Sequence, residues 1–159
     1  MRIAVLSGPN LNLLGQREPA VYGTATLPEI EDRLRGLASE LGVELETFQS
    51  NTEGTLIDYI QESAGRVDAF VVNAGGLTHT SVSLRDALVG VARPYVEVHL
   101  SNPAAREPFR HVSLLADHAL GAVVGFGAES YLLGLRGLVA RLTASAASPT
   151  PRSDHGPER

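Results

Sequence analysis

Three short segments of the sequence carry side chains that could perform acid–base chemistry. The segment GPNLNLLGQREPAVYG (8–23) is glycine-rich like a phosphate-binding loop, but it lacks the lysine and the tight glycine spacing of one. The segments NAGGLTHTS (73–81) and PYVEVHLS (94–101) each add a histidine among polar neighbours. The chemically capable side chains of the three segments are Asn10, Arg17, Tyr22, Asn73, His79, Glu97, His99 and Ser101. Together they indicate an enzyme site for a small, oxygenated anion.

Glu97 and His99 form the strongest pair among these residues. They lie two residues apart on a predicted strand, so both side chains point to the same face. A single histidine in a strand more often has a structural role. A carboxylate within reach, however, orients the imidazole and raises its basicity. The sequence therefore predicts an acid–base pair here.

Two arginines and an aspartate are less clear from the residues alone. Arg106 and Arg110 follow the same predicted strand with helical spacing, a pattern that more often covers a solvated face. Because they follow that strand, both could also reach the rim where His99 lies. Asp86 is interpreted, from the sequence pattern alone, as a surface residue of a helix.

Two residue types are missing from the chain, and their absence excludes whole classes of mechanism. There is no cysteine, which excludes thiolate nucleophiles, disulfides and cysteine-bound metal centres. There is also no lysine, because all 13 Lys and Arg positions are arginine, and this excludes Schiff-base chemistry and a Walker lysine. The histidines and carboxylates lack metal-ligand spacing, so we expect no metal.

Charge and hydropathy narrow the range of partners. The net charge is -5, and no basic stripe argues for binding to nucleic acid. No apolar run has the length of a signal peptide core or a transmembrane helix. We therefore expect a cytoplasmic protein whose partner is a small molecule, with no role for nucleic acid or membrane.

Five short apolar runs, mostly β-branched, alternate with helical patterns. These predicted strands are 2–8, 43–50, 68–75, 94–101 and 121–127. The alternation predicts one α/β domain over residues 1–143, a flavodoxin-like doubly wound sheet of five parallel strands in the order 2-1-3-4-5, with three layers. Ligands of such folds bind beyond the carboxyl ends of the strands, where the polar segments converge.

Helix boundaries are predicted from capping residues and apolar spacing. Thr26 and Glu29 have the spacing of a capping box, and Gly42 ends the helix that follows. Ser50 and Glu53 repeat the pattern before the next helix. The remaining predicted segments are helices over 80–92, 106–115 and 130–143 and a disordered tail over 144–159.

Other functions of this fold class can be compared with the same residues. A receiver domain needs an acidic pair after the first strand and an aspartate ending the third, where this chain has Ser7, Gly8 and Asn73. That interpretation fails. A flavin or nucleotide carrier needs a Ser/Thr-rich or GxGxxG phosphate loop, which GPNLNLLG is not, although helix N-termini alone can hold a phosphate. A flavodoxin-like nucleotide- or flavin-binding module therefore stays open as the alternative.

Five sequence blocks resemble, in order and spacing, the type II 3-dehydroquinate dehydratases of the shikimate and quinate pathways. The blocks are GPNLNLLGQREPAVYG, QSNTEGTLIDYI, NAGGLTHTSVSLRDAL, VEVHLSN with REPFR, and GFGAESYLLGLRGL. The resemblance implies a flavodoxin-like subunit in a dodecamer of four trimers. It also implies a cofactor-free trans-elimination of water that converts 3-dehydroquinate to 3-dehydroshikimate through an enolate. The missing lysine agrees with this, because the unrelated type I enzymes form a lysine Schiff base.

The resemblance assigns the first half of the reaction to the segment 8–23, which is a mobile lid in the family. Tyr22 corresponds to the base that removes the C2 proton. A phenol is a weak base at neutral pH, so a neighbouring positive charge must favour its ionised form. Arg17 matches the family's essential arginine, and Arg106 is a second source of that charge. Asn10 matches the residue that steadies the enolate.

The resemblance assigns the second half of the reaction to Glu97 and His99 on the predicted strand 94–101. His99, oriented by Glu97, matches the acid that protonates the departing C1 hydroxyl. Asp86 matches a residue that reaches in from a neighbouring subunit, and Pro108 replaces an acidic residue expected in relatives. The substrate-binding residues that the resemblance implies are Asn73, His79, Asp86, Leu100, Ser101 and Arg110.

Overall fold

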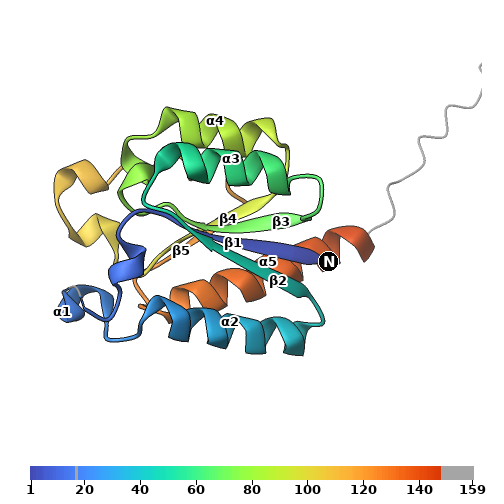
Figure 1. Cartoon of the computed structure of the whole chain (residues 1–159), viewed down its shortest axis with the longest axis horizontal. Helices are drawn as coiled ribbons and strands as arrows, with labels where there is room; N and C mark the ends of the chain where they lie inside the picture. The colour runs from blue at the N-terminus through green and yellow to red at the C-terminus, as the bar shows by residue number, and fades with distance from the viewer. Residues whose placement is uncertain (17, 148–159) are drawn as a thin grey trace, which may run out of the picture.

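A single parallel sheet of five strands organises the chain. The computed structural model describes residues 1–16 and 18–147 (Figure 1). Its strands are β1 (Arg2–Ser7), β2 (Glu44–Gln49), β3 (Ala69–Asn73), β4 (Tyr95–His99) and β5 (Gly121–Val124). They pair in the order β2-β1-β3-β4-β5, and every pair is parallel. The predicted doubly wound α/β fold is confirmed.

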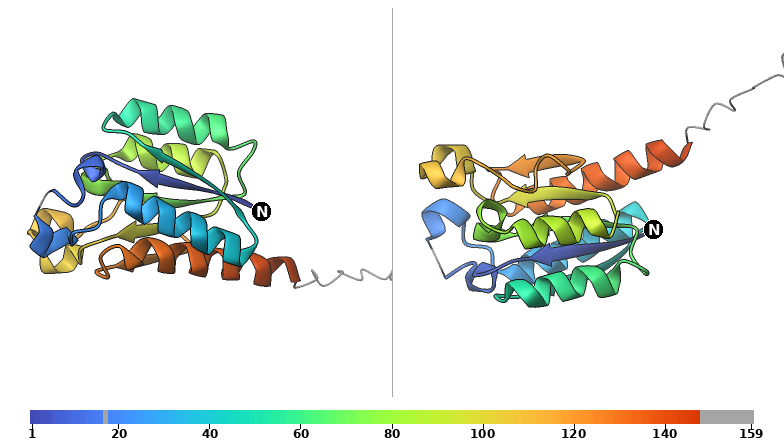
Figure 2. Two further views of the ribbon diagram at one scale, coloured as in Figure 1. Left: turned by 60° about the horizontal axis from the view of Figure 1, so that its bottom comes forward. Right: turned by 90° about the horizontal axis from the view of Figure 1, so that it is seen from above.

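Two helices cover each face of the sheet. The helices are α1 (Pro19–Tyr22), α2 (Leu27–Leu41), α3 (Glu53–Ser63), α4 (Val82–Gly90) and α5 (Glu129–Ala147). Below the sheet in Figure 1, α2 and α5 pack against each other, and α3 and α4 do so above it. The short α1 lies beyond the carboxyl ends of the strands, beside the segment that follows β4 in both views of Figure 2.

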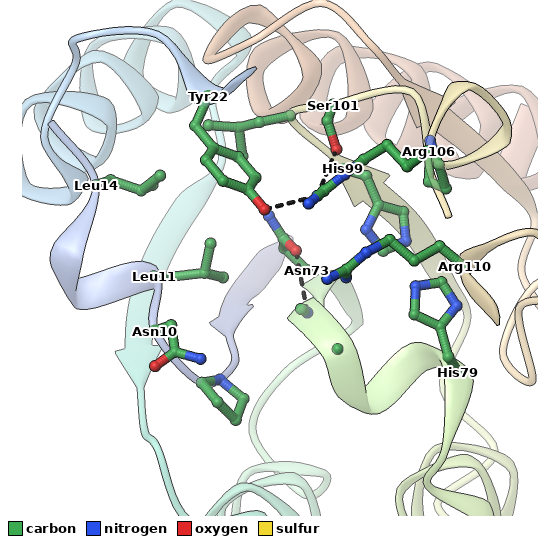
Figure 3. A pocket seen from close by; sticks show the side chains of 15 residues that line it. Asn10, Leu11, Leu14, Tyr22, Asn73, His79, His99, Ser101, Arg106 and Arg110 are labelled. Carbon is green, nitrogen blue, oxygen red and sulfur yellow. Dashed lines mark hydrogen bonds between the residues drawn. The ribbon is translucent and has the colours of Figure 1, made fainter. Parts of the chain in front are cut away.

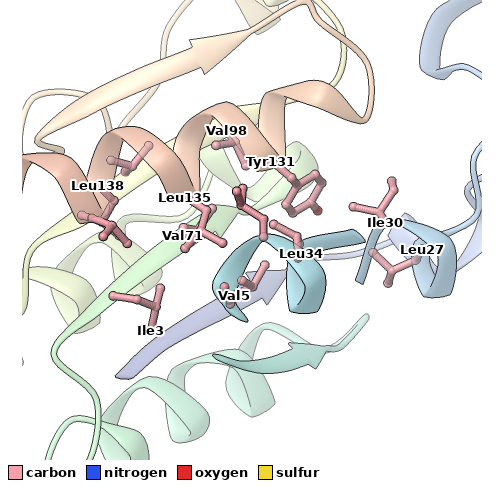
Figure 4. Close-up of a cluster of buried hydrophobic side chains, with 14 of the residues drawn as sticks. Ile3, Val5, Leu27, Ile30, Leu34, Val71, Val98, Tyr131, Leu135 and Leu138 are labelled. Atoms are coloured by element: carbon pink, nitrogen blue, oxygen red, sulfur yellow. The ribbon is translucent and has the colours of Figure 1, made fainter. Parts of the chain in front are cut away.

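Alternation along β1 divides the core into two apolar layers. Ile3 and Val5 point toward α2 and α5, where Figure 4 shows them with Val71 and Val98. Ala4 and Leu6 point to the opposite layer, under α3 and α4. All four β1 residues are almost completely buried. Burial of a large apolar side chain stabilises the fold by roughly 1.5–3 kcal/mol, so this central strand is a firm support for the residues at its end.

The start of α2 follows the predicted capping box. The Thr26 hydroxyl accepts from the backbone N–H of Glu29 at 3.3 Å, and the Glu29 carboxylate accepts from the N–H of Thr26 at 2.8 Å. Gly42 ends the helix in a left-handed conformation, φ 68°. The prediction of a second capping box was wrong: Thr52 is the residue before α3 and its side chain makes no capping hydrogen bond, while the Ser50 hydroxyl accepts from the N–H of Thr52 at 3.0 Å.

Two further helix predictions need correction. Residues 106–115 form no single helix; short 3₁₀ helices cover Pro103–Ala105 and Pro108–Arg110 instead. A proline disfavours helical geometry in the residue before it, so Pro108 interrupts the run. The last helix extends to Ala147, beyond the predicted end at 143, because the alanines there are strong helix formers despite their low hydrophobicity. The rest of the predicted tail, 148–159, lies outside the described residues.

Candidate active site

A cavity of about 140 Å³ lies beyond the carboxyl ends of β1, β3 and β4. This is the point where the strand order reverses between β1 and β3, the expected ligand site of a doubly wound sheet. The structure brings together most of the residues predicted from the sequence. Those that line the cavity are Asn10, Tyr22, Asn73, His79, His99, Leu100, Ser101, Arg106 and Arg110 (Figure 3).

Two of the predicted residues that the structure describes, Glu97 and Asp86, are not on the cavity wall. Glu97 is buried beside His99 on β4. Asp86 lies on the exposed side of α4, where its side chain is 68% exposed and forms a long ion pair of 3.8 Å with Arg85. Its place in a subunit interface stays a prediction. Arg17 lies outside the described residues.

The ends of β1 and β3 are joined closely. The backbone N–H of Gly8 donates to the carbonyl of Asn73 at 2.8 Å. A Cβ on Gly8 would lie 2.5 Å from the backbone oxygen of Ala74, so only glycine allows this approach. The side-chain oxygen of Asn73 accepts from the N–H of Gly75 at 3.2 Å, which fixes the amide at the cavity. The glycines of this region therefore serve close backbone packing.

The segment after β1 carries Asn10 and Tyr22 to opposite parts of the cavity wall. Asn10 has a left-handed backbone, φ 69°, and its N–H donates to the side chain of Asn51 at 2.9 Å. Leu11 and Leu14 anchor the segment in the apolar core. From there the chain reaches α1, whose last residue, Tyr22, projects over the cavity (Figure 3).

Tyr22 meets a guanidinium group inside the cavity. Nη1 of Arg106 donates to the phenolic oxygen of Tyr22 at 2.6 Å, and the guanidinium carbon lies 5.4 Å from the ring centre. The same nitrogen lies 3.5 Å from the hydroxyl of Ser101. A cation that donates to the phenolic oxygen stabilises its ionised form. The arrangement therefore suits Tyr22 to act as a base.

His99 is held by Glu97, as predicted. Nε2 of His99 donates to Oε1 of Glu97 at 2.7 Å, and both residues are buried on β4. Burial raises the pKa of the Glu97 carboxyl, but the hydrogen bonds from His99, Thr78 and Ser113 outweigh burial and hold the pKa below its usual range. Glu97 is therefore an anion that accepts from His99 and orients its ring, an arrangement that suits His99 to act as an acid.

His79 and Arg110 complete the polar wall. Nδ1 of His79 donates to the carbonyl of Val112 at 2.7 Å, which leaves Nε2 as the second polar atom of that ring. The ring of His79 is nearly parallel to that of His99, with centroids 6.4 Å apart. Nε of Arg110 donates to Glu107 at 2.9 Å. Two arginines and two histidines thus face one cavity, which favours an anionic ligand.

Thr78 and Ser113 are the site residues to which sequence reasoning assigned no role. Thr78 belongs to the polar segment 73–81, but no chemical role was predicted for it. Ser113 lies within 106–115, where the sequence suggested a helix. A buried carboxylate in β4 needs hydrogen-bond donors, and this requirement was the available signal that such residues exist. Within the described residues, no cluster of three or more metal-binding side chains occurs, and no helix is long and apolar enough to cross a bilayer.

Comparisons with known proteins agree on one family. The family model for class II dehydroquinases matches residues 1–139. The 3-dehydroquinate dehydratase of Prochlorococcus marinus (strain NATL1A) is 58% identical over 89% of this chain and 98% of its own length. The enzyme of that name from Synechococcus sp. (strain WH7803) is 61% identical over 89% of this chain and 97% of its own length.

A solved structure shares the same architecture. The type II dehydroquinase of Propionibacterium acnes superposes with a TM-score of 0.83 at 40% identity, covering 87% of this chain and 96% of that protein. Fold, site geometry and sequence similarity therefore lead to the same result. The chain belongs to the class II dehydroquinase family.

Proposed function

We propose that this protein is a 3-dehydroquinate dehydratase, a hydro-lyase that forms 3-dehydroshikimate through an enolate. Similarity to dehydratases over nearly their whole length supports the activity. The observation that carries the mechanism is the pairing inside one cavity of an arginine-bound phenol, Tyr22, with a carboxylate-bound imidazole, His99. These are a base and an acid on the wall of a single small site.

The first step is removal of a proton from C2, next to the ketone. The ionised Tyr22 takes this proton, and the electrons of the C2–H bond move onto the ketone oxygen to form an enolate. Arg106 favours the ionised phenol because its guanidinium donates to the phenolic oxygen. Asn10, on the cavity wall, stabilises the enolate oxygen directly or through a water. Arg17 contributes a further positive charge, as the family resemblance implies.

The second step breaks the C1–O bond. The enolate electrons return to form the C1–C2 double bond, and the hydroxyl leaves with a proton from His99 as water. Glu97 stabilises the protonated imidazole before this transfer. Afterwards Tyr22 releases the proton it gained and His99 regains one from solvent, so that both groups return to their starting states.

The remaining polar groups bind and orient the substrate. Asn73, Ser101 and the backbone at Leu100 hold the substrate carboxylate at the ends of β3 and β4. His79 and Arg110 contact the ring hydroxyls from the opposite side. Their common position on the cavity wall supports these roles.

We also propose a homo-oligomer built from trimers, with a dodecamer as its full form. Asp86 lies on α4 between the exposed apolar residues Val82 and Val89. Apolar residues grouped on an exposed helix face mark an interface, which supports contact of this face with a second subunit. Sedimentation is expected to give a mass that is a multiple of three subunits. A fully active monomer would rule the assembly out. The cytoplasmic location stays a prediction.

A flavin or nucleotide carrier is not favoured. The cavity walls carry two arginines and two histidines, and family membership points to an enzyme. Wild-type protein mixed with 3-dehydroquinate is expected to produce the ultraviolet absorbance of a conjugated enone without any added cofactor. If the substrate remains unchanged while flavin or nucleotide binds, the dehydratase function is wrong.

A further inference from the structure

The carboxylate of Glu97 is held by two hydroxyl groups that come from outside its own strand. Thr78, fully buried in the 3₁₀ helix after β3, donates a hydrogen bond to Oε1 of Glu97. Ser113, between β4 and β5, has its Oγ 2.9 Å from Oε1 and 2.8 Å from Oε2. Neither residue is part of the cavity wall. Their hydroxyl groups therefore contact the site through Glu97.

The hydrogen-bond geometry determines where the two hydroxyl protons point. Oγ of Ser113 accepts from the backbone N–H groups of Leu115 at 3.0 Å and Ala116 at 3.1 Å, which occupies both of its lone pairs. Its single proton is therefore directed to Glu97. The Thr78 hydroxyl lies 3.1 Å from that of Ser113, but Ser113 has no lone pair left to accept from it. The proton of Thr78 is thus also directed to Glu97.

Two hydroxyl protons directed at one carboxylate decide which partner carries the proton shared by Glu97 and His99. They stabilise the charged carboxylate and would lose much of that stabilisation if the proton moved onto it. The proton therefore stays on Nε2 of His99, which lies 2.7 Å from Oε1. Nδ1 is then the ring nitrogen that can donate to the substrate.

We propose that Thr78 and Ser113 are positioning residues that keep Glu97 ionised and oriented, so that His99 acts as a protonated acid through Nδ1. This inference rests on the proposed dehydratase function and adds two residues to it. Both act on the second step alone, because their hydroxyls contact the carboxylate behind His99 and neither contacts Tyr22. Their loss must therefore affect elimination more than enolate formation.

The test separates the two steps by running the reaction in deuterium oxide. When His99 is a weaker acid, the enolate returns to 3-dehydroquinate more often and carries solvent deuterium at C2. Thr78→Val removes the hydroxyl and keeps the side-chain shape. It is expected to lower kcat about tenfold at unchanged KM and to raise the ratio of C2 deuteration to product formation about fivefold. Proton NMR of the remaining substrate measures this ratio, with an enzyme-free sample to correct for spontaneous exchange.

Matched variants complete the design. Thr78→Ser restores the donor and is expected to recover most of the lost kcat. Thr47→Val removes a threonine hydroxyl from β2, where its weak contact is with Arg35, and is expected to leave both kcat and the ratio unchanged. If Thr78→Val fails to fold, Ser113→Ala compared with Ser113→Thr gives the same test, since only the second keeps a hydroxyl proton.

The outcomes distinguish a failure of the proposed hydroxyl role from a failure of the proposed dehydratase function. A wild-type exchange ratio in folded Thr78→Val, or a change in KM alone, overturns the role of the hydroxyls while leaving the dehydratase function intact. Wild-type protein that does not convert 3-dehydroquinate overturns the function itself. A raised ratio in Thr78→Val that Thr78→Ser reverses supports the inference.

Discussion

The two sides of the cavity are built in different ways. On the acid side, Glu97 and His99 belong to a central strand, and the carboxylate receives hydrogen bonds from three side chains. On the base side, Tyr22 belongs to α1, a helix of four residues none of which is buried. Its hydrogen bond to Arg106 joins it to the segment after β4. The acid side is part of the buried core, whereas Tyr22 on the base side is partly buried and packs against the core from outside.

This difference matches the demands of the two steps. An acid that releases water must hold a proton in a buried, preorganised setting, which a central strand provides. A base that covers the substrate must leave room for the substrate to enter, which suits a short helix on a surface segment. The contrast predicts that changes on the base side affect turnover alone, whereas changes on the acid side also affect stability.

The largest effect is expected from Tyr22→Phe, which removes only the oxygen that accepts from Arg106. Loss of the base should lower kcat by about 10³-fold or more, while the melting temperature stays unchanged. Enone absorbance and circular dichroism measure the two quantities.

Tyr59→Phe, which removes the α3 hydroxyl that donates to Glu46, is the matched control and should retain turnover. Arg17→Ala, at a position outside the described residues, tests the family's essential arginine in the same assay. Substantial enone formation by Tyr22→Phe would contradict the assignment.

A smaller loss of turnover, combined with a change in stability, is expected from Glu97→Gln. Removing the charge behind His99 should lower kcat by about 10²-fold. In the wild type, the lowered pKa of Glu97 adds stability above the unfolded pKa, and this stability is lost as the pH falls through the folded pKa. Thermal melts from pH 7 to pH 3 should therefore show a shallower decline in the variant. An equal decline in both proteins would contradict a stabilising contribution from the ionised Glu97 carboxylate.

Gly8→Ala tests the close backbone contact between the ends of β1 and β3, which supports both sides of the cavity. The added Cβ would lie 2.5 Å from the backbone oxygen of Ala74, so the ends of β1 and β3 must separate. We expect a loss of about 1–3 kcal/mol in urea unfolding, from overpacking. Gly137→Ala is the control: its Cβ meets open space on α5, and it should stabilise the protein by about 0.5–1 kcal/mol. Equal stability of Gly8→Ala and the wild type would show that the close approach is not required.

No inactivation of the enzyme is expected from sodium borohydride added with the substrate. The chain has no lysine, so neither side of the cavity can form a Schiff base for the reagent to trap. Mass spectrometry should find the intact chain without an adduct, and full turnover should be measured with fresh substrate after the reagent is removed. A covalent substrate adduct would disprove the two-step acid–base mechanism.

The fold could be predicted from the sequence because each strand is a compact apolar run ending in a polar segment. Parallel pairing then brings those segments to one edge, which placed Asn73, His99 and Ser101 on one cavity correctly. The Thr26 cap was predictable for the same reason, since its partner Glu29 is only three residues away. Local patterns therefore located both the elements and the rim.

What sequence reasoning missed depends on contacts between distant segments. Ser113 reaches Glu97 from a loop after β4, and no periodicity relates the two positions. The same loop was predicted as a helix over 106–115, but Pro108 interrupts the run and only a short 3₁₀ helix forms there. Ser50 had capping spacing, but the chain reached α3 through a turn at Thr52 instead. Tertiary geometry decided these cases.

The hydrogen bond between Gly8 and the end of β3 allows the segment from Pro9 to Ala25 to be replaced by the corresponding segment of a relative. One end of this segment is fixed by the Gly8–Asn73 hydrogen bond, and the other by the capping box that starts α2. Between these anchors Leu11 and Leu14 pack into the apolar core, so a replacement segment must keep apolar side chains at these two positions. Segments from relatives can therefore be grafted as cassettes onto this scaffold. The rate of proton abstraction should then follow the donor of the segment, whereas protonation of the leaving hydroxyl should follow the host.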